Sequence, residues 1–296
     1  MLNLISRWAL SLFLFGAFSF NAIAAQLSVG NEAFTEQRLL AELTKQYLNS
    51  QGHEITSKGD MFDKNLRRSI VSGRVDIAWF YTGSALRDFN QIETAMTPVQ
   101  AYELVKKLDK SHGILWLDMS ETNNSYGIAV RREDAEKYGI NNMSELDRLM
   151  LENSHWKLAT DSSFYSRKDG LKPLMKHYAH KMSHGNLKIM KPDETYDALK
   201  SGRVDIAMVY ATDGRIKAYD LVVLEDDKHF FPGYILAPVV SATLPAEEQA
   251  QVTALLNNLS GVLTTESMIE MNGRVDLEQK SVREVASHFL KANKLL

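Results

Sequence analysis

The sequence predicts an α/β protein built as two lobes. Short apolar runs alternate with longer amphipathic segments along the chain, which is typical of sheets covered by helices. At 296 residues the chain is longer than one ordinary domain and suits two lobes of moderate size. A seven-residue segment also occurs once in each half. With 45% hydrophobic residues, each lobe can bury its own core.

Residues 27–80 show the clearest alternation of predicted strands and helices. Strands are expected at Leu27–Gly30, Glu54–Ser57 and Val75–Phe80. Between them, apolar residues at helical spacing predict helices at Thr35–Asn49 and Leu66–Val71. Alternation of strand and helix favours mainly parallel strand pairing.

Later segments repeat this pattern. The expected strands are Gly127–Arg131, Lys157–Thr160, Leu187–Met190 and Val204–Val209. The expected helices are Gly170–His180, Glu247–Leu256 and Val282–Lys291. No stretch rich in Pro, Gly and Ser separates two halves. We therefore expect crossing strands to join the lobes. The first lobe is expected to comprise residues 25–127 plus 235–296, and the second residues 128–234.

The internal repeat is the most informative motif. The sequence Ser-Gly-Arg-Val-Asp-Ile-Ala occurs at Ser72–Ala78 and again at Ser201–Ala207. Each copy follows a predicted helix and leads into a predicted strand, which ends at Tyr81 or Tyr210. Coincidence is the alternative, but seven consecutive identities argue against it. We interpret the repeat as one helix–turn–strand unit used in each lobe.

The positions of the two tyrosines suggest a ligand. Ligands of open α/β sheets bind outside the carboxyl ends of the strands, so Tyr81 and Tyr210 are expected to face a common cleft. Tyrosine faces attract a trimethylammonium group, which has no N–H to donate, by about 0.5–2 kcal/mol per desolvated ring. The alternative is that these rings lie at the lobe surface or in a pocket of another kind.

The N-terminus has the pattern of a secretory signal. Arg7 is the only charged residue before residue 32, and the apolar segment Trp8–Phe20 follows it. Small residues then offer a cleavage site after Ala24, or alternatively after Ala25. We expect residues 1–24 to be a cleaved signal peptide and the protein to be periplasmic. A buried N-terminal helix is the alternative.

Several functional classes are disfavoured. There are no cysteines, which excludes disulfides and a lipid-modified N-terminal cysteine. The net charge of −3 includes no basic block for nucleic acid. No phosphate loop, dinucleotide motif or nucleophile–base pair is evident, so neither an enzyme nor a cofactor is expected. His177, His180 and His184 share one helical face, but we expect a solvated face rather than a metal site.

Six segments resemble, in the same order, those of the glycine betaine/choline-binding proteins of osmoprotectant ABC transporters: Gly30–Gln37, Ser72–Ser84, Asn123–Gly127, Arg167–Gly170, Tyr210–Gly214 and Leu224–Tyr234. The resemblance implies a type II periplasmic binding protein fold that closes over its ligand. It also implies a membrane permease as partner, a protein that acts as a monomer, and no cofactor.

The same resemblance assigns roles to individual residues. The implied aromatic box consists of Tyr81, Tyr126, Tyr210 and Tyr234. Ser84 and Asn124 are implied to line the pocket. Arg167 is implied to reach a ligand carboxylate, for which its planar fork is suited.

Glu32 departs from the family pattern, because many members have a lysine there that holds the carboxylate of betaine. Glu32 is expected either to repel a carboxylate or to pair with Arg167 and neutralise it. Either effect favours choline over betaine. The alternative is that Glu32 points to solvent.

Other interpretations stay open at this level. A receptor for an amino acid or a polyamine would need carboxylates to accept ammonium hydrogens, and Glu32, Asp169 and Asp213 are candidates. A sensory component that presents ligand to a membrane receptor is a further alternative. A related fold serves a porphyrin-pathway enzyme, but that enzyme needs a cysteine to hold its cofactor. Thr35–Gln37 has residues typical of a helix start, and no other role is expected for it.

Overall fold

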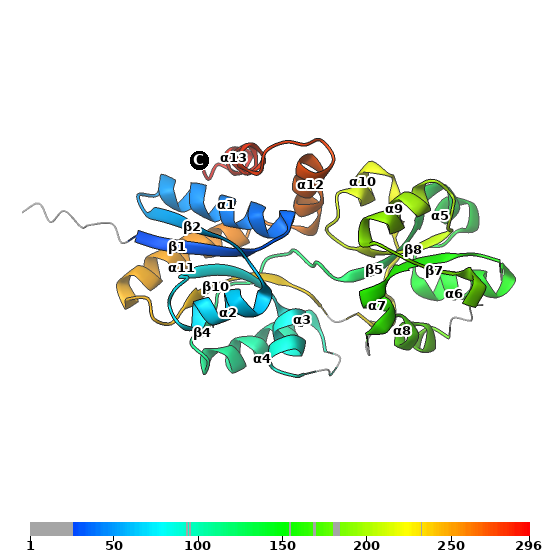
Figure 1. The fold of residues 1–296 in the computed structure, drawn as a ribbon, viewed down its shortest axis with the longest axis horizontal. Helices are drawn as coiled ribbons and strands as arrows, with labels where there is room; N and C mark the ends of the chain where they lie inside the picture. The colour runs from blue at the N-terminus through cyan, green and yellow to red at the C-terminus, as the bar shows by residue number, and fades with distance from the viewer. Residues whose placement is uncertain are drawn as a thin grey trace, which may run out of the picture.

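The computed structural model describes residues 26–296 except 93, 95, 154, 168–169, 180–183 and 232. The predicted signal peptide, Asp169 and His180 therefore lie outside the described residues. The described chain forms two lobes, each built on its own five-stranded sheet (Figure 1).

The first lobe is built on a sheet with the order β2-β1-β3-β10-β4. Its strands are β1 (Gln26–Glu32), β2 (Glu54–Met61), β3 (Ile77–Tyr81), β4 (Ile114–Trp116) and β10 (Leu236–Ser241). β1 pairs in parallel with β2 and β3, whereas β10 runs antiparallel to β3 and β4. Alternate residues of β3 and β10 enter two different hydrophobic clusters, so both faces of this sheet are buried.

Helices cover both faces of the first sheet. One cluster contains side chains of α1, α11, α12 and α13, and the other contains side chains of α2 and α4. The bounds of these elements are α1 (Thr35–Ser50), α2 (Asp63–Val71), α3 (Thr82–Ser84), the π-helical turn η1 (Ala85–Phe89), α4 (Pro98–Lys110), α11 (Ala246–Ser260), α12 (Thr265–Asp276) and α13 (Val282–Ala292).

The second lobe repeats the plan with the strand order β7-β6-β8-β5-β9. Its strands are β5 (Tyr126–Arg131), β6 (Leu158–Asp161), β7 (Leu187–Met190), β8 (Ile206–Tyr210) and β9 (Leu221–Val223). Its helices are α5 (Arg132–Tyr138), α6 (Met143–Glu152), α7 (Ser162–Ser166), α8 (Leu171–His177), the 3-10 turn η2 (His184–Asn186), α9 (Pro192–Lys200) and α10 (Arg215–Ala218).

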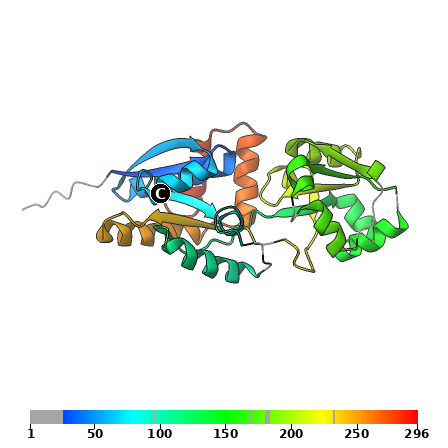
Figure 2. The same ribbon diagram turned by 60° about the horizontal axis from the view of Figure 1, so that its bottom comes forward.

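Two chain segments cross between the lobes and pair with each other (Figures 1 and 2). Asn123 and Ile235 form an antiparallel bridge. The Asn124 backbone N–H donates to the Tyr234 carbonyl at 3.1 Å, and the Leu236 N–H donates to the Thr122 carbonyl at 3.0 Å. Since the crossing segments are hydrogen-bonded as a short ribbon, the lobes are joined by extended backbone rather than by a loose linker.

The predicted repeat is one structural unit used twice. In each copy a helix, α2 or α9, ends at a turn whose glycine has a positive φ, 69° at Gly73 and 71° at Gly202. Asp76 and Asp205 then each accept a hydrogen bond from a backbone N–H on or just before the adjacent strand, both at 2.8 Å. The identical sequence therefore has identical local structure in the two lobes.

Two expectations about the fold need correction. Pairing is not mainly parallel, because β5 and β10 run antiparallel to both of their neighbours. Each of these strands enters its sheet straight from a crossing segment, without a preceding crossover helix. In addition, the strands β4, β9 and β10 and the helices α4, α5, α6, α7, α10 and α12 were not predicted. β4 and β9 are only three residues long, and α12 buries few apolar side chains.

Candidate ligand-binding site

Four tyrosines lie at the strand ends nearest the crossing segments. Tyr81 ends β3 and Tyr210 ends β8, whereas Tyr126 begins β5 and Tyr234 lies two residues before β10, the strand that returns to the first sheet. The Tyr126 and Tyr210 ring centroids are 5.1 Å apart. Tyr234 packs perpendicular to Tyr126 at 6.2 Å. The structure thus brings three of the four predicted rings into one cluster.

Tyr81 joins this cluster through the backbone next to Tyr234. Tyr81 pairs with Leu236 in the antiparallel ladder. The Tyr234 ring lies so close to the turn after Tyr81 that a Cβ added at Gly83 would come within 2.9 Å of it. The Thr82 hydroxyl donates to the Gly233 carbonyl at 2.8 Å and holds this arrangement. Both rings are nearly buried.

Arg167 is placed at the tyrosine cluster, as the resemblance implies. Its guanidinium donates to the hydroxyls of Tyr126 at 3.2 Å and Tyr234 at 3.1 Å. Its Cζ also lies 5.0 Å from the centroid of the Tyr126 ring. Arg87, which follows Ser84 and was not predicted, donates to the Tyr234 hydroxyl as well. The rings and hydroxyls of this cluster therefore already contact guanidinium groups from both lobes, Arg87 from the first and Arg167 from the second.

The tyrosine hydroxyls stay protonated at neutral pH. Burial raises the pKa of Tyr126 to about 12. Burial, together with the neighbouring Tyr126 and Asp161, also holds the pKa of Tyr210 above its ordinary value. The Tyr210 hydroxyl donates to Asp161 at 3.1 Å, which fixes the ring. The cluster therefore offers the faces of neutral rings rather than phenolate charges.

Glu32 lines a pocket of about 320 Å³ in the first lobe, beside Tyr81 and Ser84. The other acidic residues of this pocket are Asp63 and Asp88. Its wall also contains Phe34, Phe62, Phe80 and Phe89. Burial, followed by repulsion from Asp63 and Asp88, raises the pKa of Glu32 to about 7. We call the three carboxylates the acidic wall.

Two expectations about Glu32 are wrong. The side chain does not simply point to solvent, because it is partly buried in the pocket wall. Both Glu32 and Arg167 belong to the described residues, yet the structure records no ion pair between them. Arg167 instead contacts the hydroxyls of Tyr126 and Tyr234.

Glu36 has a role that the sequence did not indicate. The N-cap of α1 is Phe34, which makes no side-chain capping bond, so Thr35–Gln37 is not a capping motif. Glu36 is only 3% exposed. Its carboxylate accepts hydrogen bonds from the Tyr81 hydroxyl at 2.5 Å and from the Asn124 amide at 3.2 Å. Asn124 is therefore held next to Tyr81, as expected, but through Glu36.

Two further candidate residues, Asp213 and His177, contact groups outside the tyrosine cluster. Asp213 forms an ion pair with Arg215 at 3.1 Å, and it also accepts the Arg215 backbone N–H. The ring of His177 contacts the Lys228 carbonyl at 3.1 Å. Within the part of the chain that the structure describes, no group of three or more His, Asp or Glu side chains is arranged to hold a metal ion.

Comparison with known proteins agrees with this geometry. Residues 25–292 match the family model described as the substrate-binding domain of ABC-type glycine betaine transport systems. The chain belongs to this family. It is 35% identical to a glycine-betaine-binding protein of Pseudomonas aeruginosa, over 93% of this chain and 90% of the relative. It is 32% identical to the glycine betaine-binding protein YehZ of Escherichia coli, over 97% of each chain.

A solved structure supports the same fold. The crystal structure of a glycine betaine/carnitine/choline ABC transporter protein has a TM-score of 0.84 and 26% identity, and it covers 91% of this chain and 99% of its own. Members of the family are substrate-binding proteins of ABC importers, which act outside the cytoplasm and are not enzymes. No helix in the described range is long and apolar enough to cross a bilayer.

Proposed function

We propose that this protein captures a quaternary ammonium compound between Tyr81, Tyr126, Tyr210 and Tyr234 and delivers it to an ABC permease. The observation that carries the proposal is the cluster of Tyr126, Tyr210 and Tyr234, with the Arg167 guanidinium over one ring face. The guanidinium shows that a delocalised cation fits against these rings.

The cage chemistry suits a cation without N–H groups. A trimethylammonium group spreads its charge over methyl groups, which pack on ring faces and need no hydrogen-bond acceptor. Each desolvated ring contributes about 0.5–2 kcal/mol, so a micromolar Kd, which corresponds to about 8 kcal/mol, needs the rings together with the burial of the methyl groups. In this mechanism the ligand displaces the Arg167 guanidinium from the Tyr126 face. Arg167 can then bind a carboxylate where the ligand has one.

The acidic wall favours a ligand without a carboxylate. Glu32, Asp63 and Asp88 lie in one pocket that also contains Tyr81 and Ser84, so a carboxylate turned toward this lobe meets like charge. A hydroxyl, as in choline, can instead donate to Glu32. We infer that choline binds more tightly than glycine betaine.

Closure completes the mechanism. The ligand enters between the lobes, both lobes contribute rings, and differential contacts select the closed form. We propose that the exported monomer, cleaved after Ala24, then docks on its permease from the periplasm. For this motion the lobes are taken as residues 25–127 plus 235–296 and residues 128–234.

A ligand with N–H groups, such as a polyamine or a cationic amino acid, is the second candidate. The observation that favours it is the acidic wall, because Glu32 and Asp63 can accept ammonium hydrogens, whereas Asp88 is already paired with Arg87. Asp213 adds nothing to this candidate, because Arg215 already neutralises it.

Calorimetry on the purified protein without residues 1–24 tests the proposal. Choline, glycine betaine, carnitine and proline betaine are compared with putrescine and lysine. The proposed function expects micromolar binding of at least one methylated ammonium compound and none of the two N–H donors. Tighter binding of putrescine or lysine would support the second candidate, and tighter binding of betaine than choline would contradict the inferred selectivity.

A further inference from the structure

The buried carboxylate of Glu36 connects several parts of the molecule. Its Oε1 accepts from Tyr81 on β3 and from Asn124 on the first crossing segment. Its Oε2 accepts from the Asn272 amide on α12 at 3.0 Å. A buried carboxylate is costly unless donors surround it. Burial raises the pKa of Glu36, whereas the hydrogen bonds from these donors lower it, so each donor stabilises the ionised form.

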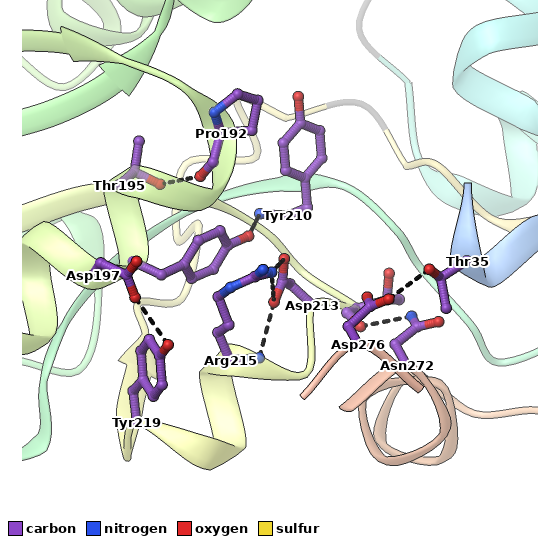
Figure 3. A network of polar contacts seen from close by, with 12 residues as sticks. Thr35, Pro192, Thr195, Asp197, Tyr210, Asp213, Arg215, Tyr219, Asn272 and Asp276 are labelled. Carbon is purple, nitrogen blue, oxygen red and sulfur yellow. Dashed lines mark hydrogen bonds and ion pairs between the residues drawn. The ribbon is translucent and has the colours of Figure 1, made fainter. Parts of the chain in front are cut away.

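Asn272 extends this connection to the other lobe. Its Nδ2 donates both to Glu36 and, at 2.9 Å, to the backbone carbonyl of Thr212. Since both partners are acceptors, the orientation of the amide is fixed, and its Oδ1 is left buried without a partner. Thr212 lies two residues after Tyr210. Figure 3 shows Asn272 beside the turn of Tyr210, Asp213 and Arg215.

The backbones of the two lobes also touch at this point. A Cβ added at Gly214 would lie 2.2 Å from the Cα of Gly273, so only glycine permits the approach. In both ribbon views α12 is the first-lobe helix that lies against α10 (Figures 1 and 2). The Thr35 hydroxyl also donates to Asp276 at the end of α12, which ties α1 to that helix.

We propose that Glu36 and Asn272 form an interlobe link that sets the spacing between the two halves of the tyrosine cage. On one side the link holds the Tyr81 hydroxyl, and on the other it holds the turn that follows Tyr210. Glu36 and Asn272 are positioning residues, since they act on the ligand through these tyrosines. The ligand readout of the proposal rests on the proposed function.

The variant Glu36→Gln separates the two sides of the link. The glutamine keeps an acceptor at Oε1 for Tyr81 and Asn124, but it places an NH₂ group against the NH₂ of Asn272. Two donors facing each other cannot bond, so Asn272 must leave Glu36 or Thr212. Asn272→Ala removes the link from the α12 side. Glu42→Gln is the matched control, because Glu42 is on the same helix and bonds Gln46 at 2.8 Å.

The first readout is the Kd for choline and glycine betaine by calorimetry. Loss of a charged hydrogen bond predicts about tenfold or more weaker binding in Glu36→Gln and in Asn272→Ala. The double variant is expected to bind no more weakly than the weaker single variant, because both changes break one link. Glu42→Gln binds like the wild type. Unchanged affinity in both single variants, or additive losses, would overturn the proposal.

The second readout needs no ligand. Hydrogen exchange of residues 211–214 should be faster in both variants than in the wild type, whereas strands β1 and β3 should exchange unchanged. Asn272→Ala keeps this test available if Glu36→Gln does not fold. If the wild type binds neither probe, the proposed function is wrong. In that case the link is judged by exchange alone, and unchanged exchange at residues 211–214 in the folded variants would overturn it.

Discussion

Tyr126 and Tyr210 stand opposite each other on the antiparallel strands β5 and β8, with their ring centroids 5.1 Å apart. The register of the second sheet therefore creates half of the aromatic cage. Directly opposed residues on one face of an antiparallel pair are close enough for their rings to touch. A slip of one residue in this pairing would send one ring to the other face and remove the cage.

Removing the Tyr210 ring should weaken ligand binding without unfolding the protein. We expect Tyr210→Ala to cost at least about 1 kcal/mol of choline binding, which is roughly a fivefold rise in Kd, because one cation–π contact is lost. Calorimetry measures the change. Tyr219→Phe is the control, since the Tyr219 hydroxyl bonds Asp197 on α9, away from the cage. Unchanged choline affinity in Tyr210→Ala would remove this ring from the cage.

Choline binding should strengthen between pH 6 and pH 8. The pKa of Glu32 is raised to about 7, so its carboxyl gains negative charge over this interval. A bound cation favours the ionised form, so binding should release a proton. Calorimetry in two buffers of different ionisation enthalpy measures that release. The other charged groups that face Glu32 in this pocket are Asp63 and Asp88, and Arg87 pairs with Asp88.

The variant Glu32→Gln isolates this effect. It should flatten the pH dependence of choline binding and raise the affinity for betaine relative to choline. A dependence on pH that persists in the variant would assign the titration to another group.

The same pKa carries a consequence for stability. The folded pKa of Glu32 lies above its ordinary value of 4.5, so the folded state binds this proton more tightly than the unfolded state. Its contribution to the free energy of unfolding is therefore fully present below pH 4.5 and is lost as the pH rises through about 7. Because the Glu32→Gln variant lacks this carboxyl, its free energy of unfolding without ligand should not show this loss as the pH rises. Urea unfolding at pH 5 and pH 8 compares the two proteins.

Much of the architecture could be predicted from local patterns. The repeat predicted the helix–turn–strand unit that ends at Tyr81 or Tyr210, because the effects of its glycine, its aspartate and its strand residues extend over only a few residues. The antiparallel entry of β5 and β10 could not be predicted, since it depends on how the chain crosses between lobes. Short strands such as β4 carry too few residues for a periodic signal.

The candidate site divides in the same way. The repeat indicated Tyr81 and Tyr210, and the family motifs added Tyr126, Tyr234 and Arg167. Glu36 was correctly placed at a helix start but was given no other role, because its partners Tyr81, Asn124 and Asn272 are far apart in sequence. A charged residue on the buried face of α1 was the only available signal. The acidic wall likewise forms from three separate segments that meet only in the folded lobe.

Gly83 should be needed for the position of the Tyr234 ring. In Gly83→Ala the new methyl group would lie within 2.9 Å of that ring, so the ring must move. Because Tyr234 packs against Tyr126, we expect choline affinity to fall by about tenfold, whereas the melting temperature should change little. Calorimetry and thermal unfolding measure the two effects. Gly261→Ala is a control for stability, since Gly261 has a φ of −65° and an added Cβ would come no closer than 3.4 Å to other atoms. Wild-type affinity in Gly83→Ala would show that the ring position is unimportant.

The stability of the first lobe should depend strongly on the Asp109 carboxylate. Asp109 is fully buried and accepts hydrogen bonds from Arg67 at 2.6 and 2.9 Å and from the Trp116 indole at 2.8 Å. Burial opposes its charge, but these bonds outweigh burial and hold its pKa below the ordinary value. Asp109→Asn would leave the Arg67 charge uncompensated, which costs about 3–5 kcal/mol when a buried pair is broken.

The exposed pair of Arg38 and Asp60 provides the matched comparison. It is also an Arg–Asp pair in the first lobe, but its side chains are 47% and 40% exposed. Exposed pairs contribute at most about 1 kcal/mol, so Asp60→Asn should lower the free energy of unfolding much less than Asp109→Asn. Urea denaturation of both variants measures the difference. Equal losses would mean that burial does not govern the strength of these ion pairs, and that Asp109 is not an anchor of the packing between α2 and α4.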